Sequence, residues 1–394
     1  MNTLVLVALA FVAIPSAFFA TYLFLLTLFS WRNRIPPASK RDTRFDIIVP
    51  AHNEATVIER TVASLRGIEW PSDKFRVVVV ADNCTDDTAN LARAAGAEVW
   101  ERFNTELRGK GYALAHAFEL SREQGFADAV VVVDADTIVS TNLLEAFASR
   151  LEQGVRAVQV DYGVLNPETS WRTRLMTIAM TAFHVVRSRS RERLVATCGI
   201  RGNGWCLTHE LLRHVPYKAF SLAEDLEFGI ALGLADCRIA YADEAHVYGE
   251  MVSREGPARK QRERWERGRF ALIRSMTLPL LREGVRRPSW LCLDLAFDLM
   301  LLPLSYVTLT LAAFVGLAAT AVFRFSFHVG WLWFAIVCAS FLVLHVARGW
   351  QLSRVGWRGL ADIAFVPWFL AWKLALMLRP PKTMGWVRTD REQP

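Results

Sequence analysis

Apolar residues are concentrated in three long stretches, and the chain between the first two carries charged residues throughout. The stretches run from about Leu4 to Phe29, from about Leu299 to Phe323 and from Val329 to Val346. Each is long enough for the helix of roughly 20 residues that crosses a bilayer. The pattern predicts an N-terminal membrane anchor (1–31), a water-soluble domain (45–287) and a C-terminal membrane region with about two spans (288–378).

Within the water-soluble domain, runs of Val and Ile alternate with segments of helical character. The predicted strands are FDIIVP, FRVVVVAD, AEVWER and AVVVVDAD, with helices starting near Glu54, Asp86, Arg108 and Asn142. Unbroken apolar runs are typical of strands buried on both faces, and strands separated by helices form parallel sheets. The prediction is an α/β fold with a doubly wound, mostly parallel sheet.

Basic residues follow the first apolar stretch, at Arg32, Arg34, Lys40, Arg41 and Arg44. The positive-inside rule therefore places the N-terminus outside and the soluble domain in the cytoplasm. The first stretch is longer than a signal-peptide core of about 7–15 residues, and no basic residue precedes it, so we expect an uncleaved anchor. The result is a multi-pass protein of the cell (inner) membrane.

The last apolar segment, ADIAFVPWFLAWKLALML, is interrupted by Pro367 and carries Asp362 and Lys373. If it crossed the membrane, the basic tail (379–394) would face outward against the positive-inside rule. We therefore expect an interfacial helix and a cytoplasmic tail, with a fourth span as the alternative. The segment SWLCLDLAFDLM is a second candidate for lying flat, because Asp294 and Asp298 would be costly in lipid unless they face protein or headgroups.

The net charge of +7 comes with a dense basic run in residues 254–287. Such a run attracts anionic lipid headgroups, by about 1 kcal/mol for each basic residue near the surface. Nucleic acid is not expected as a partner, because no nucleic-acid-binding fold motif accompanies the charge. The six cysteines form no Cys-x-x-Cys pair, so the sequence indicates neither a zinc site nor a disulfide framework.

Polar side chains gather where three predicted strands end. PAHNE follows the first strand, ADNCTDDT the second, and Asp134 and Asp136 end the fourth. One such cluster could simply cap a helix, but three at the carboxyl edge of a parallel sheet indicate a ligand site. No glycine-rich phosphate loop follows the first strand, so a nucleotide diphosphate would need a metal. Paired carboxylates suit Mg²⁺ or Mn²⁺.

A further motif, QRERWERGR, places Gln261, Arg264 and Trp265 on one face of a helix. Arginine offers a planar fork to a diphosphate, and tryptophan offers a face to a sugar ring. The alternative is an amphipathic helix at the membrane surface. The motifs GKGYAL, GNGWCLT and SLAEDLEFG lie between the strand ends and this helix.

In this motif order the chain resembles the membrane-embedded family 2 glycosyltransferases, which include cellulose, chitin, hyaluronan and poly-N-acetylglucosamine synthases. The resemblance covers residues 46–269 and rests on Asp-x-Asp, then Glu-Asp, then Gln-x-x-Arg-Trp. It implies a fold of the GT-A type with N- and C-terminal transmembrane helices.

The resemblance also implies roles for single residues in binding the nucleotide. Glu54 corresponds to the glutamate that contacts the nucleoside, although His52 stands where an aromatic residue is commoner. Asp82 is similar to the aspartate that reads the uracil edge, and Lys110 to the lysine near the nucleotide. Gln261, Arg264 and Trp265 form the closing motif.

The remaining roles concern the metal and the reaction. Asp134 and Asp136 resemble the pair that holds uridine and metal, and Asp225 resembles the general base, with Glu224 beside it. The loop GNGWCLT corresponds only loosely to the family's donor and acceptor loop.

These roles imply an inverting transferase that moves a sugar from a UDP-sugar to a growing β-linked polysaccharide. Family motifs do not distinguish this from a lipid acceptor, and a non-catalytic scaffold subunit is a remote alternative. Three membrane helices enclose little space, so secretion of a polymer would require a partner or a second copy.

Overall fold

The computed structural model describes residues 2–251 and 255–377. The chain divides into two compact units, which we describe separately. Among the described residues, the helical unit contains 2–31, 168–190 and 299–377, and the sheet unit contains 32–167, 191–251 and 255–298. The predicted basic tail (379–394) lies outside the described residues.

The sheet unit is built on eight strands in the order β3-β2-β1-β4-β7-β6-β8-β5. The first four strands in this order are all parallel: β3 (Glu98–Arg102), β2 (Phe75–Asp82), β1 (Phe45–Ala51) and β4 (Ala129–Val132). The next strand, β7, is antiparallel to β4. The others are β5 (Thr137–Val139), β6 (Ala157–Val164), β7 (Trp205–Thr208) and β8 (Ala240–Gly249). β6 and β8 are parallel, whereas β7 and β5 run antiparallel to their neighbours. The predicted mostly parallel α/β sheet is confirmed.

Helices cover both faces of the sheet. One buried cluster joins β1 and β2 to α2 (Ile58–Arg66) and α5 (Leu143–Leu151), and the opposite cluster joins the sheet to α4 (Lys110–Gln124) and α9 (Glu224–Leu234). The remaining helices of this unit are α3 (Thr88–Ala94), α8 (His209–His214), α10 (Glu255–Arg286) and α11 (Trp290–Met300). α7 (Arg187–Arg193) passes from one unit to the other.

Helices α2, α3, α4 and α5 begin one to four residues after the predicted starts at Glu54, Asp86, Arg108 and Asn142. Polar groups of Glu54, Asp86 and Asn142 bond to other segments of the chain instead. The backbone N–H of Glu54, for example, donates to Thr88 Oγ1 over 2.8 Å.

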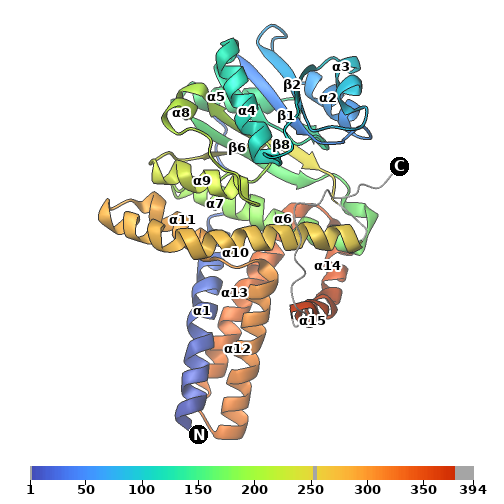
Figure 1. Ribbon diagram of the computed structural model, residues 1–394. Helices are drawn as coiled ribbons and strands as arrows, with labels where there is room; N and C mark the ends of the chain where they lie inside the picture. The colour runs from blue at the N-terminus through green and yellow to red at the C-terminus, as the bar shows by residue number, and fades with distance from the viewer. Residues whose placement is uncertain (1, 252–254, 378–394) are drawn as a thin grey trace. The chain divides into compact units, whose positions relative to one another are not determined.

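Three helices of the helical unit are long and apolar enough to cross a membrane: α1 (Asn2–Leu28), α12 (Leu304–Phe325) and α13 (Gly330–Ser353). They lie side by side (Figure 1). A histidine on α13, His345, bonds Thr27 Oγ1 through Nδ1 over 2.8 Å. The three apolar stretches of the sequence are therefore confirmed as helices of spanning length.

The segment between the sheet strands β6 and β7 contributes to the helical unit, which the order of the chain does not reveal. α6 (Trp171–Thr181) and the π-helical turn η2 (Ala182–Val186) pack on α13. Gly349 permits the contact, because a Cβ there would lie 2.8 Å from the Ala182 Cβ. α6 also contacts α14 (Gly356–Asp362), where Arg174 Nε donates to Asp362 Oδ2 over 2.5 Å.

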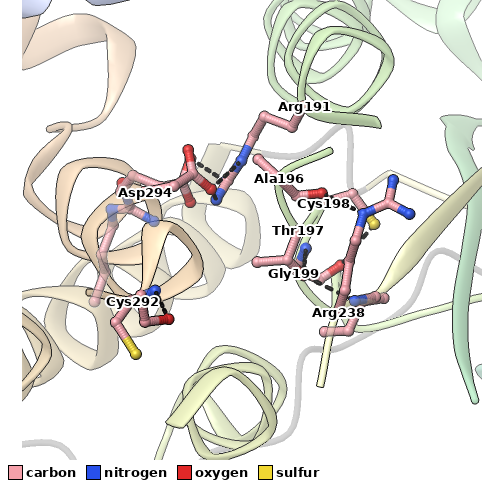
Figure 2. Close-up of polar contacts among 12 residues, drawn as sticks. Arg191, Ala196, Thr197, Cys198, Gly199, Arg238, Cys292 and Asp294 are labelled. Atoms are coloured by element: carbon pink, nitrogen blue, oxygen red, sulfur yellow. Dashed lines mark hydrogen bonds and ion pairs between the residues drawn. The ribbon is translucent and has the colours of Figure 1, made fainter. Parts of the chain in front are cut away.

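The two aspartates of SWLCLDLAFDLM face protein. Both lie on α11 and are buried with Arg191, whose side chain is fully buried and pairs with each carboxylate. Arg191 Nη1 lies 2.6 Å from Asp298 Oδ1. Arg191 Nε donates to Asp294 Oδ2 over 3.1 Å, as Figure 2 shows. This pairing resolves the alternative left open by the sequence. The last apolar segment forms α14, a short 3₁₀ turn and α15 (Val366–Met377), and none of them is among the helices of spanning length in the described chain.

Candidate functional site

A lysine joins the end of β4 to the loop before β7. Lys110, the first residue of α4, donates from Nζ to Asp134 Oδ1 over 2.5 Å and to the Gly202 carbonyl over 2.7 Å. The preceding Gly109 has φ of +122°, a conformation that favours glycine and starts the helix at Lys110. Two motifs that are 24 residues apart in sequence thus meet in one ion pair.

Asp225 stands beside the same loop. It lies in the first turn of α9, where the helix dipole favours negative charge. A Cβ added at Gly202 would lie 3.3 Å from Asp225 Oδ2, so the carboxylate stands directly beside this glycine. Gly202 has φ of +82°, and a side chain there would be strained as well as crowded. The structure therefore brings Lys110, Asp134 and Asp225 to one place.

The charges of this cluster shift one another's pKa values. Burial lowers the pKa of Lys110, but the charges of Asp134, Glu224 and Asp225 more than offset it, and the net shift is upward. Burial and, to a smaller extent, the Asp225 charge raise the pKa of Glu224 to about 7, although Lys110 opposes the shift. Lys110 is therefore charged near neutral pH, and Glu224 keeps its proton to a higher pH than an ordinary glutamate.

Two buried amides hold the Asp-x-Asp loop. Asn203 Oδ1 accepts from the Asp134 N–H over 3.0 Å, and Asn203 Nδ2 donates to Thr137 Oγ1 over 2.8 Å. Gln159 Nε2 in turn donates to the Asn203 carbonyl over 2.7 Å. Both amide side chains are fully buried. Asn203 lies in the motif GNGWCLT, but Gln159 was missed in the sequence, where its only signal is an amide inside an apolar strand.

The carboxylates of Asp134 and Asp136 fit a divalent cation. Both residues are partly exposed at the end of β4, and both offer hard oxygen ligands. Within residues 2–251 and 255–377 no group of three or more His, Cys, Asp or Glu side chains is arranged to hold a metal. An aspartate pair would therefore leave coordination positions for phosphate oxygens and water, as Mg²⁺ prefers.

Asp82 is positioned by an arginine that sequence reasoning missed. Arg102 Nη1 donates to Asp82 Oδ1 over 2.5 Å, and Arg102 Nη2 donates to the Leu107 carbonyl over 2.8 Å. The His52 ring bonds the Asp82 carbonyl through Nδ1 over 2.7 Å. Because β1 and β2 are parallel neighbours, the loop carrying Glu54 lies at the same edge as Asp82. Arg102 ends the third predicted strand, and nothing in the local pattern marks it as a partner of Asp82.

The closing motif lies on α10, which packs beside α9. A Cβ at Gly268 would lie 2.8 Å from the Ala223 Cβ, directly before Glu224. Gln261 and Arg264 are partly exposed, and Trp265 is 39% exposed. In the described parts of the chain these three side chains make no hydrogen bond to Lys110, Asp134 or Asp225. The described structure therefore brings their helix to α9 but shows no polar contact of the three side chains with the site.

A solved structure has the same fold as this chain. A mannosyltransferase from Pyrobaculum calidifontis, solved with GDP-Man and Mn²⁺, matches 89% of this chain and 99% of its own at 18% identity, with a TM-score of 0.51. This likeness shows a shared fold.

The sequence relatives have several activities. A probable glycosyltransferase of Bacillus subtilis (YdaM) is 22% identical over 60% of this chain and 57% of its own. A probable glucomannan 4-beta-mannosyltransferase of Arabidopsis thaliana is 22% identical over 60% of this chain and 46% of its own. The beta-monoglucosyldiacylglycerol synthase of a Nostoc species is 25% identical over 57% and 48%. The chain spans about half the length of the curated relatives it matches.

The model of the family described as "Glycosyltransferase like family 2" matches residues 43–268, which is more than half of the chain and contains every motif of the cluster. The predicted resemblance is thereby confirmed, and the chain is a family 2 glycosyltransferase.

Proposed function

We propose that this enzyme transfers a sugar from a UDP-sugar, with inversion at the anomeric carbon, to a growing β-linked polysaccharide. The observation that carries the proposal is the meeting of Asp225, Gly202, Lys110 and Asp134. It supports one carboxylate on the acceptor side and a carboxylate and ammonium pair on the donor side.

In the proposed reaction an acceptor hydroxyl attacks the anomeric carbon while the bond from that carbon to the diphosphate breaks. Asp225 takes the hydroxyl proton, which is worth typically 10²–10⁴-fold in rate. A single base opposite the leaving group suits direct displacement, so an α-linked donor gives a β-linkage. Glu224 precedes Asp225 in α9, and the charges of the two carboxylates repel each other.

Donor binding is assigned to the sheet edge and to α10. Mg²⁺ or Mn²⁺, held by Asp134 and Asp136, would neutralise the diphosphate as it leaves. Lys110 and Arg264 add positive charge on the same side. Asp82, fixed by Arg102, would accept a hydrogen bond from the base.

Glu54, Gln261 and Trp265 complete the proposed donor site, with Glu54 at the nucleoside. Trp265 offers its partly exposed ring to the sugar. An aspartate at the base edge can accept from uracil or from guanine, because both carry a ring N–H donor. The solved relative's GDP-Man therefore makes a GDP-sugar the second donor to test.

A lipid acceptor is the second candidate function. It is favoured by the similarity to the Nostoc beta-monoglucosyldiacylglycerol synthase, whose name describes a glycolipid product. In both cases we propose a multi-pass protein of the inner membrane with a cytoplasmic catalytic domain, because basic residues follow α1. A polymer product would call for a secretion partner or a second copy.

The test is a donor panel with the purified full-length protein in lipid nanodiscs. UDP- and GDP-sugars are supplied with Mg²⁺ or Mn²⁺, and label is followed into aqueous and lipid fractions. UDP-dependent label in a β-linked glycan supports the proposal. Label in the lipid fraction would show that the acceptor is a lipid and not a polysaccharide. Turnover with GDP-sugars alone would contradict the assignment of a UDP-sugar as donor.

A further inference from the structure

The strands beyond β7 present one partly exposed face beside Asp136. β5 and β8 are antiparallel, with Ile138 opposite Tyr248. Along both strands burial alternates: Ile138, His246 and Tyr248 are partly exposed, while the residues between them are buried. Because side chains on a strand alternate between faces, these three lie on one face of the sheet. Asp136 is also partly exposed and lies in the turn directly before β5, so one of the two candidate metal ligands adjoins this face.

The side chains on this face are held by specific contacts. His246 Nδ1 bonds Asp161 Oδ2 over 3.0 Å, and the two side chains are 33% and 14% exposed. The Tyr248 ring stacks beside His246, with centroids 5.9 Å apart and planes inclined by 26°. One edge of the Tyr248 ring also contacts Gly163, where a Cβ would stand 2.9 Å from the ring atoms Cδ1 and Cε1. We call Ile138, Asp161, Gly163, His246 and Tyr248 the β6–β8 face.

The chemistry of the β6–β8 face suits a neutral sugar ring. An ionised Asp161 keeps the proton of His246 on Nδ1, which leaves Nε2 as an acceptor for a hydroxyl. Tyr248 and Ile138 offer apolar surface to the C–H face of a sugar. Nearby charges are mostly acidic, from Asp136, Asp161 and the Arg60-paired Glu250, so an anionic group would be repelled unless a metal intervened.

We propose that the β6–β8 face is an acceptor subsite, which binds a neutral, hydroxyl-bearing sugar ring of the acceptor next to the donor diphosphate. The inference rests on the proposed function, because it assigns the binding of the acceptor in the same reaction. His246 and Tyr248 are binding residues in this account, and Asp161 orients the imidazole.

The experiment compares Tyr248→Leu with Tyr162→Leu in the full-length protein. Tyr162 is the matched control, because it is the neighbouring strand's tyrosine and lies over Gly249 on the opposite face. Cellobiose serves as the probe, in saturation-transfer NMR and as acceptor, with glucose 1-phosphate as its anionic counterpart. Hydrolysis of the nucleotide sugar by water reports donor-site integrity without any acceptor.

We expect Tyr248→Leu to weaken cellobiose binding and raise its KM about 10-fold, while donor hydrolysis is unchanged. Tyr248→Phe should restore binding, and His246→Gln should weaken it. Unchanged cellobiose KM in Tyr248→Leu, an equal loss in Tyr162→Leu, or preferred binding of glucose 1-phosphate overturns the subsite. Absence of nucleotide-sugar turnover in the unaltered protein instead contradicts the proposed function.

Discussion

Replacing Arg191 with Met should be among the most destabilising single changes in the sheet unit. The guanidinium is fully buried, and the side chains of Asp294 and Asp298 are 5% and 4% exposed. Without Arg191 two carboxylates remain buried beside each other with no cation in this triad. Breaking a buried ion pair by removing one partner costs about 3–5 kcal/mol. For a domain of this size each kcal/mol lowers the melting temperature by about 2–4 °C, which gives a loss of about 6–20 °C.

The assay is thermal unfolding of the detergent-solubilised protein, followed by tryptophan fluorescence at one scan rate. The matched control is Arg93→Met, which removes the exposed partner of Glu101, with the two side chains 46% and 38% exposed. That change should cost at most about 1 kcal/mol. Adding D294N and D298N to R191M should recover most of the loss, because the amides need no counter-charge. A shift in melting temperature for R191M no larger than that for R93M would show that the buried ion triad does not stabilise the fold.

Other predictions concern the site. Asn203→Ala should lower transfer at least about 10-fold and weaken nucleotide binding in the presence of Mg²⁺, because it removes the hydrogen bonds that hold the Asp134 N–H and Thr137 Oγ1; unchanged turnover would show that these bonds are dispensable. Glu224 has a pKa raised to about 7, so the folded protein binds this proton more tightly than the unfolded chain. Metal-free protein should therefore lose stability as pH rises from about 4.5 through about 7. Glu224→Gln should remove that slope, as melting temperatures at pH 5.5 and pH 8 would show; an unchanged slope would contradict it.

The sheet could be predicted from the sequence because its signals are local. The parallel strands β1, β2 and β4 contain short runs of Val and Ile, and the carboxylates that follow β4 stand within the same few residues. The cation partner of the two aspartates on α11 could not be predicted in the same way, because Arg191 lies 103 residues from Asp294.

Within the site, the sequence identified chemical types but not how they are held. Asp134, Lys110 and Asp225 could be selected from motifs, and the structure brings them together. Gln159 and Arg102 could not, because a buried amide or arginine takes its meaning from the backbone or carboxylate it meets after folding. Only the fold shows such partners.

We propose that the Asp225 carboxylate acts in the transfer step, whereas other residues hold the nucleotide. The most direct measurement is nucleotide release and nucleotide affinity in the same preparations of unaltered protein and Asp225→Asn. We expect the variant to lose transfer by about 10²-fold or more while its nucleotide Kd stays within about twofold. Transfer at the original rate would contradict this proposal.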